Sequence, residues 1–263
     1  MPETVTVITG ASSGIGAALA RQLGARKDKL VLAARRREEL RIVSTQTGAE
    51  ALCVVTDVTR RGDMEHLRDT ALEEYGHVDI WVNNAGRGIM RQVMELTDRE
   101  FDEIVEVVLK SVFYGMQAII PHFQERGRGH LINVSSFLGR VPLVPYRSIY
   151  SASKSAVNTL TACLRMDLKE KFPGIHVSTV MPGIVDTDFH KIAGPGLPVR
   201  AGGNLGPTRV ESAEEVAGKI VSLLGNPLPE LYTSSSQTEV VKRYFEDVGR
   251  FEERMAGRAA GSS

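Results

Sequence analysis

Short runs of apolar, often β-branched residues alternate along the chain with longer segments whose apolar residues recur at helical spacing. The short runs predict strands at residues 5–9, 30–34, 51–56, 78–82, 130–135, 175–181 and 230–233. The longer segments predict helices at residues 13–26, 36–47, 62–75, 98–125, 150–172 and 213–224. Strands that are apolar throughout need cover on both faces. The pattern therefore predicts an α/β fold in which a doubly wound parallel sheet lies between two helical layers, as one domain over residues 1–263.

Two C-terminal segments depart from this alternation. Residues 184–208 are rich in glycine and proline, show no periodicity and are too numerous for an ordinary connection. We expect them to form a lid over a substrate. Residues 238–257 show helical spacing with mixed charge, which predicts one helical tail before a frayed terminus.

The composition is that of a globular protein with a full-sized core. Of 263 residues, 42% are apolar, and 32 basic side chains balance 32 acidic ones, so the field that nucleic-acid-binding proteins use is absent. There is no signal-peptide pattern, and the most apolar stretch, residues 104–123, contains Glu106 and Lys110, so we expect no membrane partner. Two distant cysteines, Cys53 and Cys163, are expected to be core residues in a reducing cytoplasm.

A glycine-rich segment joins the first predicted strand to the first predicted helix. Glycines in such a turn let the backbone approach a pyrophosphate, whose charge the exposed amides and dipole of the helix N-terminus balance. By itself the segment is also compatible with an ordinary tight turn. On the first strand of a repeating α/β pattern it predicts a Rossmann-like dinucleotide site. The residues of this predicted site are Gly10, Ser12, Ser13, Gly14, Ile15 and Gly16.

The end of the second predicted strand indicates which nicotinamide cofactor is bound. A site for the unphosphorylated cofactor carries an acidic residue there, to bind the ribose 2′-hydroxyl. This chain has Arg35, Arg36 and Arg37 instead, and a guanidinium can bind a 2′-phosphate with paired, charge-assisted hydrogen bonds. We predict NADP(H), with Arg35 as the main contact and Arg36 as a supporting one. The alternative is a solvated basic start to a helix.

Tyr150 and Lys154 lie four residues apart at the start of a predicted helix, hence on one face. A phenol has a pKa near 10, too high for ready proton exchange at neutral pH. An ammonium 4 Å away favours the phenolate by up to about 4 kcal/mol at an effective dielectric of 20, which is about three pH units. Such a shift is enough for Tyr150 to act as acid and base, although a Tyr-x-x-x-Lys pair by itself also occurs by chance on many helices.

The same chain carries Asn133-Val134-Ser135-Ser136 after the fifth predicted strand and Asn83-Asn84-Ala85-Gly86 after the fourth. Together with the glycine loop and the Tyr-x-x-x-Lys pair, these segments resemble the short-chain dehydrogenase/reductase family over about residues 5–188. The resemblance implies that Ser136, Tyr150 and Lys154 are catalytic. It also implies further cofactor contacts, from Asp57 and Val58 at the adenine, from Asn84, Ala85 and Gly86 beside the adenosine ribose, from Tyr150 and Lys154, and from Pro182, Gly183 and Thr187 at the nicotinamide amide.

The reaction implied is hydride transfer between NADP(H) and a carbonyl or secondary alcohol. Tyr150 would exchange the proton, Ser136 would hydrogen-bond the same oxygen, and Lys154 would bind the nicotinamide ribose. Ser135 is the alternative to Ser136, and Tyr146 to Tyr150, although Tyr146 lacks a lysine four residues later. Strand alternation points Ser135 and Ser136 to opposite faces, so only one faces a substrate.

One position departs from the family's pattern. The family usually carries an asparagine on its long helix that helps to hold a water linked to the lysine, and here Val108 occupies that place. Valine neither donates nor accepts a hydrogen bond, so the proton relay needs another anchor or runs more slowly. The alternative function is therefore a catalytically weakened NADP(H)-binding protein with a regulatory or assembly role.

Three further expectations concern partners. The resemblance implies a homodimer or homotetramer formed through the helices at residues 98–125 and 150–172. Residues 137–147 and 184–208 are expected to determine substrate specificity, and their mixed apolar and glycine character indicates a moderately hydrophobic small molecule. The six histidines show neither HxxxH nor HxH spacing, so we expect no metal.

Overall fold

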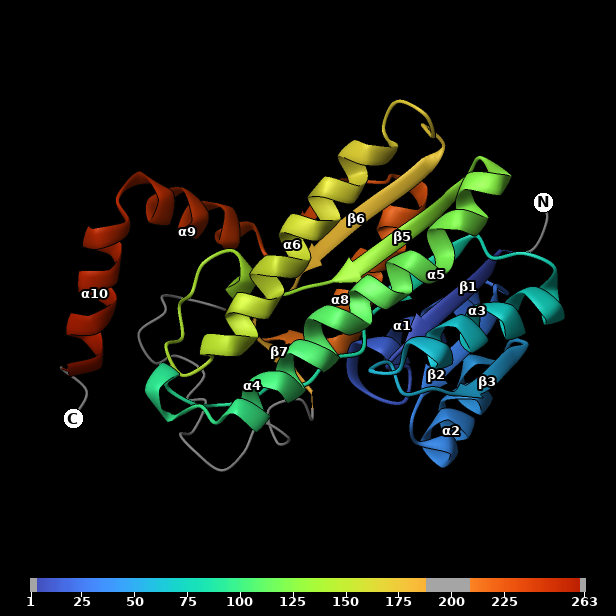
Figure 1. Cartoon of the computed structure of the whole chain (residues 1–263), viewed down its shortest axis with the longest axis horizontal. Helices are drawn as coiled ribbons and strands as arrows, with labels where there is room; N and C mark the ends of the chain where they lie inside the picture. The colour runs from blue at the N-terminus through green and yellow to red at the C-terminus, as the bar shows by residue number, and fades with distance from the viewer. Residues whose placement is uncertain (1–3, 188–208, 261–263) are drawn as a thin grey trace.

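The predicted strands pair into one parallel sheet in the spatial order β3-β2-β1-β4-β5-β6-β9 (Figure 1). The computed structural model describes residues 4–187 and 209–260. The strands are β1 Val5–Thr9, β2 Lys29–Ala34, β3 Ala51–Val55, β4 Ile80–Asn83, β5 Gly129–Val134, β6 Ile175–Met181 and β9 Glu230–Tyr232. The predicted Rossmann-like α/β fold is confirmed. The strand order reverses between β1 and β4, and doubly wound sheets bind ligands at the carboxyl ends of such strands.

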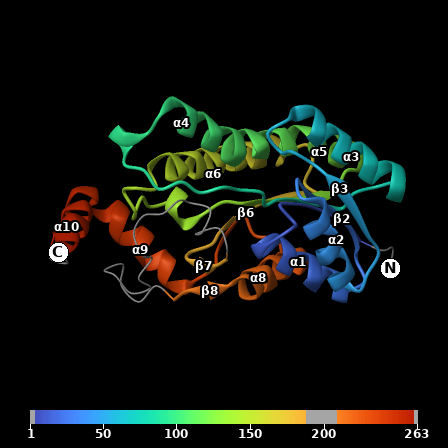
Figure 2. The ribbon, with the colours of Figure 1, turned by 90° about the horizontal axis from the view of Figure 1, so that it is seen from below.

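Helices cover both faces of this sheet (Figure 2). One layer contains α1 Gly14–Ala25, α2 Arg37–Thr47 and α8 Ala213–Gly225. The other layer contains α3 Arg61–Tyr75, α4 Asp98–Ile104, α5 Ser111–Arg126 and α6 Ser148–Leu168. Alternation along β1 places Ile8 in the core beneath the first layer and Val7 in the core beneath the second. The large side chains of Trp81 and Phe123 fill the second core.

The helix predicted at residues 98–125 contains a π-helical segment, Val105–Lys110, between α4 and α5. The Ser111 amide therefore donates to the Glu106 carbonyl, five residues back. The Ser111 hydroxyl donates to the Val107 carbonyl at 2.6 Å. This widened turn contains Val108, which is fully buried.

In the described residues, the segment Asp98–Arg126 alone is long and apolar enough to cross a membrane by length and composition. Glu106 and Lys110 do not by themselves rule out a span, contrary to the expectation from the sequence. Half of the most apolar part of the segment is buried inside the protein, and core helices can be equally long and apolar. Packing of Met116, Ile119 and Phe123 against the sheet accounts for its hydrophobicity.

The C-terminal region differs from prediction. The predicted C-terminal tail is helical, but it forms two helices, α9 Ser235–Glu246 and α10 Val248–Ala260, which are separated by Asp247 in an extended conformation. Residues 185–186 of the predicted lid form β7 Val185–Asp186, which pairs with β8 Glu211–Ser212, and residues 188–208 lie outside the described residues. Cys53 is half-buried, but Cys163 is exposed, so its placement in the core is also wrong.

Candidate active site

The glycine loop after β1 is packed too closely for larger residues. Gly10 has a φ of +67°, and a Cβ atom on it would lie 2.8 Å from the Ala85 Cα. A Cβ on Gly16 would lie 2.4 Å from the Gly10 carbonyl oxygen. Real Cβ atoms do not approach other atoms so closely, so both positions require glycine. The loop therefore lies directly against the segment that follows β4.

Thr9 and Asn84 join these two segments. The Asn84 Nδ2 donates to the carbonyls of Thr9 at 3.0 Å and of Gly10 at 3.3 Å. The Thr9 hydroxyl accepts from the amides of Asn84 at 3.0 Å and Ala85 at 3.2 Å, and donates to the Val82 carbonyl. Thr9 was not predicted, because its role appears only when the ends of β1 and β4 are adjacent.

The N-terminus of α1 suits an anion. Its N-cap residue, Ser13, makes no side-chain capping bond, and the first turn contains no acidic residue. The amides of this turn therefore have no side-chain acceptor of their own. A Cβ on Gly14 would lie 3.3 Å from the Thr187 Cγ2, so the predicted nicotinamide segment reaches the loop. These features fit the pyrophosphate of a dinucleotide.

Arg36, and not Arg35, contacts the glycine loop. Its Nη2 donates to the hydroxyls of Ser12 at 3.1 Å and Ser13 at 3.4 Å. Its Nη1 lies 3.4 Å from a carboxylate oxygen of Glu39. Arg35 is exposed at the end of β2. The guanidinium that lies beside the glycine loop is therefore that of Arg36.

The predicted adenine contacts lie beyond β3. The Asp57 Oδ1 accepts from the Thr59 amide at 3.1 Å and from the Thr59 hydroxyl at 2.8 Å, which closes a tight turn. Val58 is buried in the core cluster beneath α3. Residues 57 and 58 thus lie after the strand next to β2, where an adenine bound across the sheet's carboxyl edge would lie.

The three predicted catalytic residues lie together. Ser136, at the end of β5, hydrogen-bonds the side chain of Tyr150 in α6. The Lys154 Nζ lies 5.9 Å from the centre of the Tyr150 ring and donates to the Val134 carbonyl at 2.7 Å. Both Tyr150 and Lys154 are buried.

The alternatives to Ser136 and Tyr150 make other contacts. The Ser135 hydroxyl donates to the Lys154 main-chain carbonyl at 3.2 Å. Tyr146 is half-buried in the loop before α6, where its carbonyl accepts from the Arg91 amide at 2.7 Å. The geometry therefore favours Ser136 with Tyr150.

Burial dominates the protonation of this site. It raises the pKa of Tyr150 above that of an ordinary phenol, against the opposing effects of the Ser136 hydrogen bond and the positive charge of Arg147. Burial also lowers the pKa of Lys154 to about 8. The predicted lowering of the Tyr150 pKa is therefore wrong for the protein alone, because loss of hydration outweighs the nearby charges.

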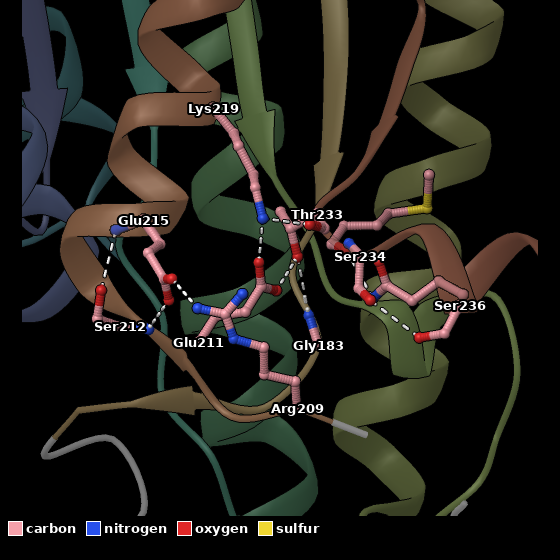
Figure 3. Close-up of polar contacts among 11 residues, drawn as sticks. Gly183, Arg209, Glu211, Ser212, Glu215, Lys219, Thr233, Ser234 and Ser236 are labelled. Carbon is pink, nitrogen blue, oxygen red and sulfur yellow. Dashed lines mark hydrogen bonds and ion pairs between the residues drawn. The ribbon is translucent and has the colours of Figure 1, made fainter. Parts of the chain in front are cut away.

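A polar cluster with a buried carboxylate, that of Glu211, anchors the segment after β6 (Figure 3). The Gly183 amide donates to the Thr233 hydroxyl at 3.4 Å, and that hydroxyl donates to the Glu211 carboxylate. Lys219 pairs with Glu211 and also donates to the Thr233 carbonyl. These residues hold Gly183, a predicted nicotinamide contact, to β8, α8 and the end of β9.

Sequence reasoning missed that cluster. It also missed further contacts of the segment that contains Pro182 and Gly183. The Pro182 carbonyl accepts from the Phe137 amide at 2.9 Å, which ties the segment to the loop carrying Ser136. The Gln237 Nε2 donates to the Met181 carbonyl at 3.2 Å. The capping box of Ser234 and Gln237 is the available signal, because this spacing marks a helix start near residue 235.

Apolar side chains surround the rest of the site. Ile104, Val108 and Ile149 form a buried cluster with Tyr150. Beyond Ser136, Phe137 and other apolar residues of its loop pack against side chains from β9, α9 and α10. In the part of the chain that the structure describes, no group of three or more His, Cys, Asp or Glu side chains is arranged to hold a metal ion.

Known proteins with the same architecture carry related chemistry. The family model described as short chain dehydrogenase matches residues 4–196. An uncharacterized oxidoreductase of Staphylococcus epidermidis is 30% identical over 225 residues, which cover 86% of this chain and 92% of that protein.

Two solved structures are similar over most of their length. A short chain dehydrogenase/reductase from Burkholderia phymatum in complex with NAD has a TM-score of 0.84 at 27% identity, with 94% of each chain covered. An alcohol dehydrogenase from the archaeon Thermococcus sibiricus complexed with 5-hydroxy-NADP has a TM-score of 0.76 at 30% identity, covering 88% of this chain and 95% of that one. The chain therefore belongs to the short-chain dehydrogenase/reductase family and is an NAD(P)-dependent oxidoreductase.

Proposed function

We propose that the protein interconverts a moderately hydrophobic carbonyl compound and its secondary alcohol with NADP(H). The observation that carries this proposal is the hydrogen bond between Ser136 and Tyr150, with Lys154 one helical turn away. A protein that only binds a dinucleotide needs no buried tyrosine paired with a serine hydroxyl. The arrangement of these three side chains therefore supports catalysis.

The residues of the glycine loop are those that would hold the cofactor. The α1 amides would bind its pyrophosphate, and Arg36 with Ser12 would bind a 2′-phosphate. Thr187 and Gly183 would contact the nicotinamide amide. When bound, the cofactor supplies or accepts the hydride.

The protein's own groups move the proton. In reduction, the Tyr150 hydroxyl donates its proton to the carbonyl oxygen, while the Ser136 hydroxyl donates a hydrogen bond to the same oxygen. In oxidation, the Tyr150 phenolate accepts the proton of the alcohol. Burial keeps water from competing for these bonds, and the Lys154 ammonium lies beside the ring on which the negative charge appears.

The loop after Ser136 supports a hydrophobic substrate. Phe137, Val141 and Leu143 are buried, and their cluster includes Tyr244 and Phe251 from the C-terminal helices. We propose that the substrate binds beside this apolar cluster, which favours an apolar carbonyl compound over a sugar or a charged acid.

A panel of carbonyl compounds tests this proposal, with NADPH absorbance at 340 nm as the readout. We expect oxidation of NADPH with apolar ketones or aldehydes and little with sugars. Tight NADPH binding without oxidation by any compound would instead support the alternative function suggested by Val108, which is a catalytically weakened NADP(H)-binding protein.

Two arginine variants test the cofactor preference. Arg36→Asp should shift the ratio of kcat/KM for NADPH over NADH toward NADH, because a carboxylate repels the 2′-phosphate. Arg35 was predicted to be the main contact, and Arg35→Asp to move the preference toward NADH, but the hydrogen bonds of Arg36 to Ser12 and Ser13 favour Arg36. An unchanged ratio in both variants would show that other groups select the cofactor.

A further inference from the structure

A second buried cation lies beside the catalytic tyrosine. Arg147 precedes α6 and is only 5% exposed. Its guanidinium carbon lies 5.9 Å from the centre of the Tyr150 ring, the same distance as the Lys154 Nζ. No motif of the sequence pointed to Arg147, since arginine is ordinarily an exposed residue.

The backbone around Arg147 is fixed from both sides. Its amide donates to the Val144 carbonyl at 2.9 Å, and its carbonyl accepts from the Ser151 amide at 2.8 Å as the first bond of α6. A parallel bridge joins it to Arg91, whose carbonyl also accepts from the Ser148 hydroxyl at 3.2 Å. The backbone that carries the Arg147 side chain is therefore firmly held.

We propose that Arg147 is a positioning residue whose guanidinium stabilises the phenolate form of Tyr150. This inference rests on the proposed function, in which Tyr150 gives up and recovers a proton in each catalytic cycle. In reduction the O–H bond of Tyr150 breaks as the carbonyl oxygen takes the proton, and the negative charge left on the phenol is balanced by Arg147 as well as by Lys154.

The surroundings make this charge effective. In the described part of the chain, Tyr150 belongs to a cluster of apolar side chains from the π-helical segment, α4, α6 and the loops at Ile89, Leu96 and Leu138, and it hydrogen-bonds the Ser136 side chain. The charged groups that face the ring are Arg147 and Lys154. In such a weakly polarisable setting a cation about 6 Å away has a large effect on a phenol. In agreement, the charge of Arg147 acts to lower the pKa of Tyr150.

Arg147 also has a property that Lys154 lacks. Burial lowers the pKa of Lys154 to about 8, so above that pH its ammonium loses its charge in the protein alone. Burial also lowers the pKa of Arg147, but an ordinary guanidinium holds its proton far more strongly than an ammonium does. Arg147 therefore supplies the positive charge beside Tyr150 at alkaline pH, where alcohol oxidation requires the phenolate.

The test is a pH titration of Tyr150 in the NADP⁺ complex of Arg147→Gln. The titration is monitored by carbon-13 NMR of protein labelled at the tyrosine Cζ. The Tyr150 signal is assigned by its loss in Tyr150→Phe. We expect Arg147→Gln to raise the titration midpoint by about one to two pH units. Arg147→Lys should restore most of the shift, because it keeps the charge. Arg147→Met serves as a second variant if Arg147→Gln does not fold. The unbranched side chain of methionine fills the space of the arginine stem without its charge.

Arg165→Gln is the matched control. Arg165 lies near the other end of α6, is also partly buried and donates to the carbonyls of Val177 and Pro229 at 2.9 Å. Its replacement should lower stability and leave the Tyr150 midpoint unchanged. The pH profile of kcat/KM for alcohol oxidation should shift upward in Arg147→Gln by the same amount as the NMR midpoint.

An unchanged Tyr150 midpoint in folded Arg147→Gln and Arg147→Met would overturn the inference. So would a loss of activity that is equal at every pH, since that is the mark of a purely structural role. The NMR titration needs no turnover, so a shifted midpoint in a protein that reduces no carbonyl would support the inference while refuting the proposed function.

Discussion

The glycine loop, at the cofactor end of this site, is held by backbone contacts, whereas the start of α6, at the catalytic end, is held by side-chain contacts. At the glycine loop, backbone atoms touch backbone atoms, and the fit fails if Gly10 or Gly16 gains a single carbon. At the start of α6, side chains from three segments meet in a buried cluster, where the protonation of Tyr150 and Lys154 depends on burial and on nearby charge.

That difference determines what each end requires of its surroundings. A backbone cradle needs the correct residue types at fixed spacing and little else. The chemistry of a buried phenol depends on every dipole and charge within several ångströms, because the interior screens them weakly. Local motifs therefore describe the cofactor end well and the catalytic end only in part.

The largest expected effect separates the two ends. Tyr150→Phe should lower kcat by about 10²- to 10⁴-fold, because the variant has no proton to donate. NADPH affinity, measured by isothermal titration calorimetry, should stay within a few-fold of wild type. Tyr146→Phe is the control on the adjacent loop and should keep its turnover. Turnover retained in Tyr150→Phe would rule out this tyrosine as the proton donor.

The burial of Lys154 makes a prediction about stability and pH. Its pKa is about 8 in the folded protein and 10.5 in the unfolded chain, so between these values the unfolded chain binds more protons. Raising the pH through this range should therefore stabilise the wild type relative to Lys154→Met, by up to about 3 kcal/mol. Urea unfolding at several pH values measures the difference. Parallel curves for the two proteins would show that Lys154 is not perturbed by burial.

Gly16→Ala tests the cofactor end. Its Cβ would lie 2.4 Å from the Gly10 carbonyl oxygen and 2.6 Å from the Asn84 Nδ2, so the loop must shift. We expect a loss of about 1–3 kcal/mol in stability and weaker NADPH binding. Gly62→Ala is the control, since nothing lies within 4 Å of the added carbon in α3 and alanine is the better helix former. Equal behaviour of the two variants would contradict the proposed packing.

The smallest expected effect sharpens the comparison at the catalytic end. Val108→Asn places an amide in the π-helical segment, where the family usually carries one, and we expect kcat to rise a few-fold. The buried amide should lower stability by about 1 kcal/mol. Steady-state kinetics and urea unfolding measure both changes. A kcat equal to that of the wild type would mean that other groups already anchor the proton relay.

The elements of the fold were predictable because their signals are local. Each strand is a short apolar run and each sheet-covering helix has a regular apolar stripe, so β1 to β6, β9 and the helices beside them lie where the sequence placed them. The C-terminal helices were misread as one, because the break at Asp247 interrupts a pattern that remains helical on both sides.

The parts of the candidate site that depend on residues close together in the sequence were predictable. The pair of Tyr150 and Lys154 needs one turn of helix, and the glycine loop needs one strand-to-helix turn. The anchoring of Gly183 by Thr233 and Glu211 joins residues about 20 to 50 positions apart, and no local signal announces it. The burial of Arg147 and its effect on Tyr150 likewise depend on packing between distant segments.

A crystal structure of the NADP⁺ complex tests the central claim most directly, which is that both ends of the site serve one cofactor. The account predicts the pyrophosphate on the amides at Gly14 to Gly16, the 2′-phosphate beside Arg36, and the nicotinamide ring facing the Tyr150 hydroxyl. A nicotinamide turned away from Tyr150, or a dinucleotide bound away from the glycine loop, would contradict it.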